Sequence, residues 1–322
     1  MSRWLSQPEA GGVISSIVVF SFFAMVAGKS GFLSPLGTAY WLDSAAHLGI
    51  IAIPVAMLMI AGEFDLSIGA MAGASSMIVG MCTGYFNLNP WAGVIVAVLA
   101  AAIVGLVNGL IVVRTRLPSF IVTLATMFMI GGGILGIAIG VTGSSSISAI
   151  ATGSAGAVFA LKWNEFSVAI VHWIVVGAVA IYTMQRTVFG NWVYATGGNE
   201  QTARMAGVPT ARVKIILFMA TAMGAALVGI IETYTFQNGS VTLGAQYVFS
   251  AIAACVIGGI LLTGGYGSVL GTAFGAITYG IISMGVFFLG WNSDLTELFI
   301  GLLLLLGVMT NNRLRQLVLG RT

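Results

Sequence analysis

Residues 61–73, AGEFDLSIGAMAG, carry the side chains of this chain best placed for chemistry in apolar surroundings. Glu63, Asp65 and Ser67 lie at alternate positions between two apolar runs. An ionised carboxylate at the centre of a bilayer costs roughly 2.5–3.5 kcal/mol on insertion scales, so it needs a partner or a function. Asp65 could cap a helix that begins at Leu66. The broken helix end could also form part of a polar pathway or a gate, and the two interpretations are compatible.

No residue pattern in the chain indicates catalysis. A Ser/His/Asp set, an HExxH motif and a pair of catalytic acids are all missing from the sequence. The phosphate-binding pattern GxxxxGK followed by Ser or Thr is missing too, so we do not expect this chain to hydrolyse nucleotide. Cys82 and Cys255 fit neither a metal site nor a disulfide framework, and His47 and His172 are single. We therefore expect no metal and no cofactor in this chain.

Residues 194–214, YATGGNEQTARMAGVPTARVK, form the one long polar segment between two apolar halves. Five residues carry the signals of a short helix over residues 200–206: Asn199, Glu200, Arg204, Gly207 and Pro209. The asparagine can cap the first turn, and the glutamate and arginine suit the positive and negative ends of the helix dipole. The glycine allows a left-handed stop, and the proline prevents continuation. Such a helix is suited to contact a partner outside the bilayer.

The composition requires a membrane to position these residues. Of the 322 residues, 58% are hydrophobic and only 7% are charged, whereas a soluble domain has roughly a quarter charged residues. The mean hydropathy is +1.05, and the apolar runs do not alternate, which indicates helices rather than a barrel. We predict an all-α polytopic membrane protein with about ten transmembrane helices, at residues 13–27, 46–60, 66–82, 91–113, 120–141, 167–184, 213–231, 247–262, 268–288 and 295–309.

The basic residues give these helices an orientation, because cytoplasmic loops are enriched in Lys and Arg. Ten spans place most of the basic residues on one side: Arg3, Arg114, Arg116, Arg186, Arg204, Arg212, Lys214, Arg313, Arg315 and Arg321. Only Lys29 and Lys162 fall on the other side. We therefore predict that both termini are cytoplasmic.

Two further features lie in apolar surroundings. Glu232 ends the seventh span and could bind a coupling proton. We favour an exposed or hydrogen-bonded residue at the outer interface. Residues 258–271, GGILLTGGYGSVLG, are dense in glycine and predict a tight helical hairpin, because glycine lets helices approach closely.

These segments resemble one known family, the membrane permease subunits of bacterial ABC importers for ribose, xylose, arabinose, galactose and related small sugars. GEFDLSIG is similar to the family's GGIDLSVG, and LPSFIVTLATM resembles its IPPFIVTLGTL. The segment at 194–214 matches the family's long cytoplasmic loop, and AIAACVIGGILLTGGYGSVLGTAFGA is similar to AIAAVVIGGTSLSGGRGSVIGTLIGA. The four matches follow the family's order over nearly the whole chain. Glu63 replaces a common glycine, and Tyr266 stands where the family often has arginine, so the particular sugar stays open.

The resemblance implies a single permease domain over residues 1–322 that forms a homodimer in the bacterial inner membrane, in contact with lipid and not with nucleic acid. Separate cytoplasmic subunits would bind ATP and Mg²⁺, and a periplasmic binding protein would deliver a small sugar. The loop at residues 185–212 would then hold the family's coupling helix, which sits in a groove of the ATPase. Its coupling residues would be Asn199, Glu200, Ala203, Arg204 and Gly207.

Two of these coupling residues, Ala203 and Gly207, are small enough to permit a close approach to the ATPase. The candidates for the pathway or its gate are Glu63, Asp65, Ser67, Asn108, Ser119 and Thr123. Other functions remain open at this point. The chain could be an ABC permease for branched-chain amino acids or another small solute. It could also be an ion-coupled secondary transporter with Asp65 and Glu232 as coupling sites. A membrane enzyme would need a catalytic set that the sequence lacks.

Overall fold

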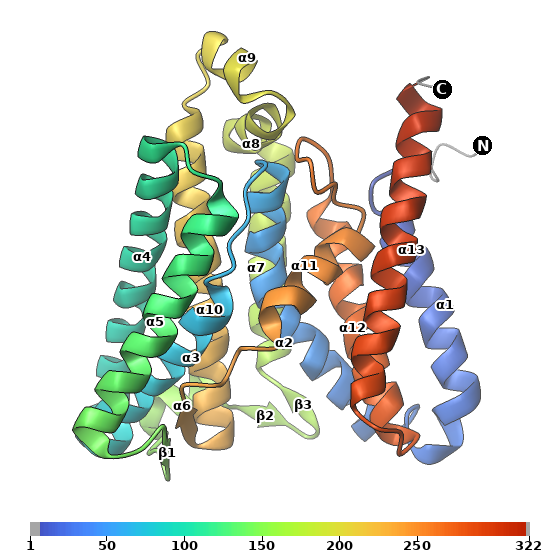
Figure 1. Ribbon diagram of the computed structural model, residues 1–322. Coiled ribbons are helices and arrows are strands. Elements are labelled where there is room, and N and C mark those ends of the chain that lie inside the picture. The colour runs from blue at the N-terminus through green and yellow to red at the C-terminus, as the bar shows by residue number, and fades with distance from the viewer. Residues whose placement is uncertain (1–6, 320–322) are drawn as a thin grey trace.

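Long helices cross the molecule from one end to the other (Figure 1). The computed structural model describes the backbone of residues 7–319 and the side chains of residues 7–307. The helices are α1 (Ala10–Ala27), α2 (Pro35–Ile60), α3 (Ile68–Val79), α4 (Pro90–Thr115), α5 (Ser119–Thr142), α6 (Gly153–Phe159), α7 (Ala169–Arg186), α8 (Val188–Gly198), α9 (Glu200–Met205), α10 (Thr210–Phe236), α11 (Tyr247–Ile257), α12 (Val269–Phe288) and α13 (Asp294–Leu319). The strands are β1 (Ser146–Ser148), β2 (Lys162–Trp163), β3 (Phe166–Ser167) and β4 (Asn238–Ser240).

Each predicted span lies on a helix of this structure. Eight helices within the described residues are long and apolar enough to cross a membrane, where α3 counts together with the π-helical turn Gly80–Tyr85. The prediction for residues 247–262 is wrong at its C-terminal end. There α11 has only 11 residues and stops before Gly258, and Gly259 adopts a positive φ of 94°. Helix α13 covers the last predicted span, although the side chains of residues 308 and 309 lie outside the described residues.

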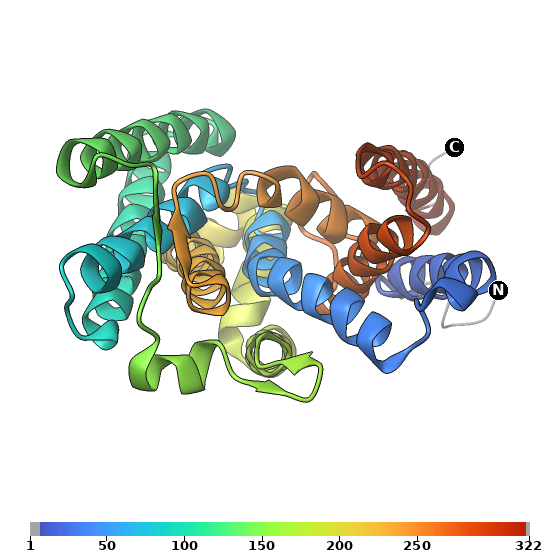
Figure 2. The same cartoon turned by 90° about the horizontal axis from the view of Figure 1, so that it is seen from below.

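The second helix, α2, is the centre of the bundle. It contacts α7, α10, α11 and α12 and is surrounded by them in the end-on view (Figure 2). In the most apolar 18 residues of α2, 89% are buried, against 17% for α5 at the edge of the molecule. A helix that is apolar on all sides belongs in the interior, whereas in a membrane the outer helices can expose apolar side chains to lipid. Helix α2 is therefore the central helix, against which α7, α10, α11 and α12 pack.

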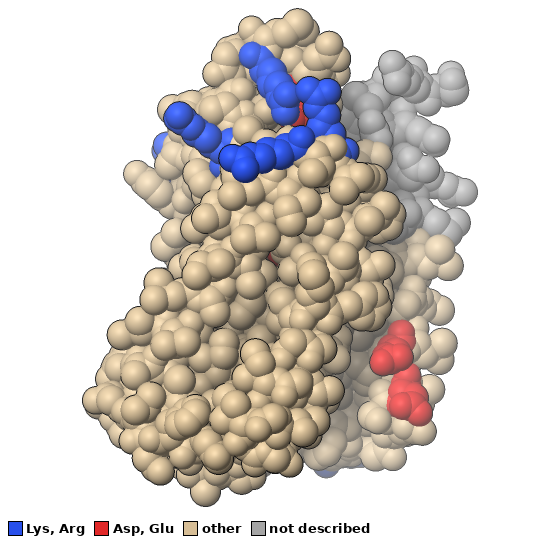
Figure 3. All heavy atoms as spheres, turned by 60° about the vertical axis from the view of Figure 1, so that its left-hand side comes forward, with Lys and Arg blue, Asp and Glu red and all other residues tan. Residues whose placement is uncertain are grey.

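The two ends of the molecule differ in structure and in charge. One end carries α9, the start of α1 and the end of α13, and the other carries α6 and the small strands (Figure 1). The strands form two antiparallel pairs, β1 with β4 and β2 with β3. Lysine and arginine side chains gather at the α9 end (Figure 3). Arg3 and Arg321, and the side chains of Arg313 and Arg315, lie outside the described residues.

Glycines form a close junction beneath α9. The end of α2, the end of α8 and the loop between α11 and α12 meet there, and the amide of Gly265 donates to the carbonyl oxygen of Ile60 at 2.8 Å. A Cβ at Gly264 would lie 2.8 Å from the Cα of Gly62, which is closer than real side chains come. The predicted hairpin at residues 258–271 is confirmed, because α11 and α12 pack against each other where Gly258 meets Gly271. The glycines of the loop between them pack against the ends of α2 and α8.

We expect Gly197→Ala to destabilise the protein through this junction. A Cβ at Gly197 would collide with the carbonyl oxygen of Ile60 and lie 2.7 Å from the amide nitrogen of Gly265. Overpacking of this kind costs about 1–3 kcal/mol. A Cβ at the adjacent Gly198 would meet no neighbouring atom within 4 Å, so Gly198→Ala is the matched control. Thermal unfolding in detergent should give a lower midpoint for the first variant only, and equal midpoints would contradict the packing argument.

Candidate functional site

Helix α9 has the capped form that the sequence predicts. The side-chain Oδ1 of Asn199 accepts a hydrogen bond from the amide of Thr202 at 2.9 Å. Glu200 forms an ion pair with Arg204 one turn later, at 2.5 Å. Gly207 follows the helix with a φ of +83°, which is left-handed backbone that favours glycine. The predicted helix is confirmed, and it ends at Met205, one residue earlier than expected.

The outward face of α9 is made by residues other than those expected. Ala203 is only 5% exposed because its own chain covers it, so the expectation that it permits close approach of a partner is wrong. Met205 is 76% exposed at the end of the helix. The sequence reasoning missed this residue, although a methionine in a polar helix of six residues is a visible signal. Gly207 is exposed, and its expected role in the close approach of a partner stays a prediction.

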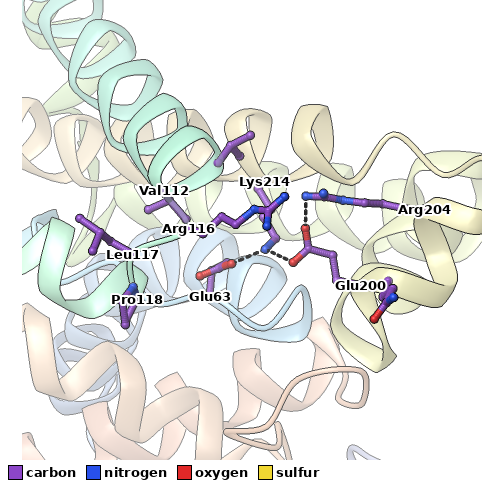
Figure 4. A pocket seen from close by; sticks show the side chains of 10 residues that line it. Glu63, Val112, Arg116, Leu117, Pro118, Glu200, Arg204 and Lys214 are labelled. Atoms are coloured by element: carbon purple, nitrogen blue, oxygen red, sulfur yellow. Dashed lines mark hydrogen bonds and ion pairs between the residues drawn. The ribbon is translucent and has the colours of Figure 1, made fainter.

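A pocket of about 620 Å³ lies beside α9 at the basic end of the molecule (Figure 4). Its walls come from α9 and from residues 116–118 in the loop between α4 and α5. Glu63 and Lys214 also line it, from the α2–α3 loop and from near the start of α10. The pocket therefore separates the outer helix α9 from the α4–α5 hairpin.

Four of the five charged side chains that line this pocket form one continuous chain of ion pairs, which we call the four-charge cluster, and the fifth is Arg116. Lys214 Nζ lies 2.5 Å from Glu63 Oε1 and 2.6 Å from Glu200 Oε2. Glu200 Oε1 lies 2.5 Å from Arg204 Nη2. Two carboxylates thus balance two cations. The sequence had suggested separate roles for Glu63 and Glu200, and it gave no sign that Lys214 joins them.

The charges of the cluster set the protonation of Glu200. Burial by itself raises the pKa of this carboxyl, but the hydrogen bonds and charges of Lys214 and Arg204 outweigh burial and lower the pKa below its ordinary value. An acid with a lowered folded-state pKa stabilises the fold above its unfolded-state pKa. The contribution is lost as the pH falls through the folded-state value, so the contacts of Glu200 hold α9 in place at neutral pH.

Asp65 organises the junction between α2 and α3. Its Oδ1 accepts hydrogen bonds from the amide of Ser67 at 2.9 Å and from the Ser67 hydroxyl at 2.6 Å. Its Oδ2 accepts from the Thr221 hydroxyl of α10 at 2.5 Å. The prediction that Asp65 caps a helix beginning at Leu66 is wrong in position, because α3 begins at Ile68 and Ser67 is the residue before it. Burial raises the pKa of Asp65, and the hydrogen bonds from Ser67 and Thr221 partly offset this.

The other candidates from the sequence meet at the same junction. The hydroxyls of Ser119 and Thr123 accept hydrogen bonds from the amides of Phe64 and Leu66, each at 3.0 Å. Asn108 Nδ2 donates to the Ser67 hydroxyl at 3.1 Å. The first turn of α5 thereby satisfies backbone groups that the break in the helix would leave without partners.

The structure therefore brings five of the six pathway or gate candidates together in one buried network, and the sixth, Glu63, lies beside it and pairs with Lys214 instead. The most exposed of them, Glu63, is 9% exposed. The sequence reasoning missed two members, Thr126, which donates to Asn108 Oδ1 at 2.7 Å, and Thr221. Threonines inside apolar helices give no sequence signal of such a partner. This network can hold the α2–α3 junction in one arrangement relative to α4, α5 and α10.

Glu232 lies away from this site, at the C-terminal part of α10. It is 8% exposed and accepts a hydrogen bond from the Tyr247 hydroxyl of α11. Of the two alternatives expected for this residue, exposed or hydrogen-bonded, the structure shows the hydrogen-bonded one. The contact ties α10 to α11.

We expect Glu232→Gln to keep most of the transport activity that the family resemblance implies. The glutamine carbonyl can still accept from the Tyr247 hydroxyl, so the contact between α10 and α11 persists. Uptake should stay within about threefold of the wild type, because the hydrogen bond is kept and only the charge of its acceptor is lost. Uptake into vesicles, normalised to the amount of inserted protein, measures this. An abolished uptake at normal protein levels would favour a proton-coupled transporter.

The chain matches known transport proteins over most of its length. The family model described as branched-chain amino acid transport system, permease component, matches residues 37–308. The fructose import permease protein FrcC of Rhizobium meliloti is 31% identical over 97% of this chain and 87% of its own. The ribose import permease protein RbsC of Escherichia coli K12 is 30% identical over 84% of each chain. The galactose/methyl galactoside import permease protein MglC of Haemophilus influenzae is 31% identical over 88% of each chain. No solved structure gives a significant match.

The extent of these matches agrees with the fold. The matched residues run from the start of α2 into α13, and so include the buried junction, the four-charge cluster and α9. The eight apolar helices long enough to cross a membrane fit the inner-membrane location of such proteins. The chain belongs to the family of ABC import permeases, the membrane subunits that transport the solute and are not themselves enzymes.

Proposed function

We propose that this chain is the membrane subunit of an ATP-driven importer for a small sugar, and that α9 is the helix on which the ATPase docks. The observation that carries this proposal is a capped helix at the basic end of the molecule, with Met205 76% exposed. A rigid helix with an exposed apolar side chain suits a groove on a partner. The family model is described for branched-chain amino acids, but the relatives named above import fructose, ribose and galactose, which favours a sugar.

The partners follow from this assignment. A cytoplasmic ATPase binds ATP and Mg²⁺, since the sequence of this chain has no phosphate-binding loop of its own. A periplasmic binding protein delivers the sugar to the opposite end of the molecule. Asn199, Glu200, Arg204 and Gly207 shape the docking helix, and Met205 supplies its apolar contact.

The membrane topology that fits this function has ten spans with both termini in the cytoplasm. Helix α13 then adds a ninth span to the eight described above, and the tenth crossing combines the short helix α11 with the non-helical chain on either side of it. Two observations support this proposal. The lysines and arginines gather at the α9 end (Figure 3). The start of α1 and the end of α13 lie at the same end of the molecule (Figure 1).

The assembly that we propose contains two copies of this chain, in contact through α5. This helix is the most exposed of the eight candidate spans. A Cβ added at any of five of its glycines would meet no neighbouring atom within 4 Å: Gly131, Gly132, Gly133, Gly136 and Gly140. Glycines at a spacing of four residues let two membrane helices approach closely. The mass of the detergent-solubilised chain, measured by light scattering, distinguishes a dimer from a monomer.

Reconstitution into vesicles tests the function. The chain and its ATPase are reconstituted into vesicles, and the binding protein is added with labelled ribose, fructose, galactose or leucine. Uptake of each solute is then measured. We expect uptake of a sugar that requires ATP and the binding protein. Uptake that an ion gradient drives without ATP would overturn the proposal. ATP-dependent uptake of leucine and of none of the sugars would show that the solute is an amino acid.

A further inference from the structure

The four-charge cluster joins α9 to the α2–α3 junction. Glu200 and Arg204 belong to α9, Lys214 is the fifth residue of α10, and Glu63 belongs to the loop before α3. The cluster thus runs from the outer helix to the base of the pocket (Figure 4). Among the ion pairs of the described residues, the pair between Lys214 and Glu200 is the one that connects α9 with this base.

Burial divides the cluster into an inner and an outer pair. The side chains of Lys214 and Glu63 are 10% and 12% exposed, whereas those of Glu200 and Arg204 are 34% and 46% exposed. A buried ion must keep a partner, because an uncompensated buried charge is strongly unfavourable. An exposed pair contributes little by itself and exchanges easily with water. The inner pair is therefore the fixed part, and the outer pair can move.

The order of the charges allows the cluster to separate without leaving a buried ion unpaired. If α9 moves away from α10, Glu200 keeps Arg204, its neighbour one turn along the same helix. Lys214 keeps Glu63 at the base. Two neutral pairs then replace one cluster of four charges. Opening also breaks two contacts of the Thr210 hydroxyl on α10, which accepts from Arg204 Nε at 2.9 Å and donates to Glu200 Oε1 at 3.4 Å. Water can replace this hydroxyl at the exposed outer pair. The connection between Glu200 and Lys214 can therefore open and close without stranding a buried charge, which a lone lysine between two carboxylates could not do.

We propose that the four-charge cluster is a reversible clasp that passes movement of α9 to the α2–α3 junction. This inference rests on the proposed docking of an ATPase on α9 and names the residues that connect docking to the membrane part. Glu63 lies two residues before Asp65, whose hydrogen bonds hold α3 and α10 together. A displacement of α9 that moves Lys214 and Glu63 therefore also displaces Asp65 and the buried network. Glu63 and Lys214 are positioning residues in this scheme and contact no solute.

The first test is Glu63→Gln in the complete complex. The substitution leaves Lys214 with Glu200 as its only carboxylate partner in the cluster, so α9 cannot separate without stranding a buried cation. The ATPase should still bind, because α9 is unchanged. Stimulation of ATP hydrolysis by the binding protein, relative to the unstimulated rate of the same preparation, should fall at least about fivefold, as should uptake. Glu165→Gln, in the turn between β2 and β3 at the other end of the molecule, is the control.

A double-mutant cycle tests whether Glu63 and Lys214 act as one unit. Groups that share one interaction have non-additive effects. We expect the combination of Glu63→Gln and Lys214→Met to reduce the stimulation no more than the worse of the two single variants does. Multiplied losses would mean independent roles and would overturn the clasp. Arg212→Met removes an exposed positive charge two residues away on α10 and should leave the stimulation near the wild-type value.

A distance measurement separates this inference from the proposed function. Spin labels at Gln201 on α9 and Leu117 in the α4–α5 loop lie on opposite walls of the pocket. In the wild-type complex the distance between them should change when a non-hydrolysable ATP analogue binds, and in Glu63→Gln it should stay at the nucleotide-free value. An equal change in both proteins overturns the clasp and leaves the docking proposal intact. A wild-type chain that binds no ATPase overturns the proposed function itself.

Discussion

Replacing Met205 with glutamate is expected to abolish docking of the ATPase while leaving the membrane part folded. Met205 is 76% exposed, so the substitution creates no cavity and buries no charge in the isolated chain. In a partner's groove the same side chain would be buried, and full burial of a methionine is worth about 1.5–3 kcal/mol. The loss of this contact, together with the burial of a new charge, should weaken binding by at least about 30-fold.

The measurement is copurification of the ATPase with the solubilised permease, followed by titration of the ATPase. Phe86→Glu is the matched control, because Phe86 is 52% exposed in the turn before α4, at the opposite end of the molecule. The control should bind the ATPase as the wild type does. Normal binding by Met205→Glu would remove α9 from the docking surface and leave the assignment to rest on the family alone.

The capped helix could be predicted because its signals are local. Asn199 caps the first turn and Gly207 supplies the left-handed stop, and each acts within a few residues of itself. The same holds for the long apolar helices, whose positions follow from continuous hydrophobic runs. Helix α8 was not predicted, although Thr187 caps its first turn and two glycines end it, because residues 188–198 mix apolar, aromatic and glycine residues without a long apolar run.

The connections of the site could not be predicted, because they join residues far apart in the sequence. Lys214 lies next to Glu63 only because α10 packs against α2 and α3. The covering of Ala203 and the short length of α11 depend on packing in the same way. The carbonyl of Pro8 lies against Gly259, where the chain has left α11, and no signal within 247–262 reveals that contact. Sequence reasoning found the polar residues of the site but not their partners.

Asp65→Leu is expected to be the most damaging single substitution in the buried network. Asp65 is 1% exposed and accepts three hydrogen bonds. Leucine would leave the Ser67 amide without its acceptor, and a buried unsatisfied donor costs about 1–3 kcal/mol. The link from the α2–α3 loop to Thr221 of α10 would also be lost. The level of folded protein in the membrane should fall severely, and any remaining protein should transport poorly.

Asp65→Asn is the matched comparison and should retain much of the transport. The amide oxygen can accept both hydrogen bonds from Ser67. The amide NH₂ can donate to the Thr221 hydroxyl, which is free to direct its own proton to the carbonyl of Phe218, 2.9 Å away. Asparagine therefore replaces every contact of the carboxylate without its charge.

The pH dependence of stability distinguishes a hydrogen-bonding role of Asp65 from a role that requires its negative charge. Burial raises the folded-state pKa of this carboxyl, so its contribution is fully present below the unfolded-state pKa and is lost as the pH rises through the folded-state value. At neutral pH, Asp65→Asn should then have an unfolding midpoint equal to or above that of the wild type. Only the wild type should gain stability from this group on acidification. A complete loss of uptake by a stable, normally inserted Asp65→Asn protein would instead require the charge itself, which an ion-coupled transporter needs and a hydrogen-bonded junction does not.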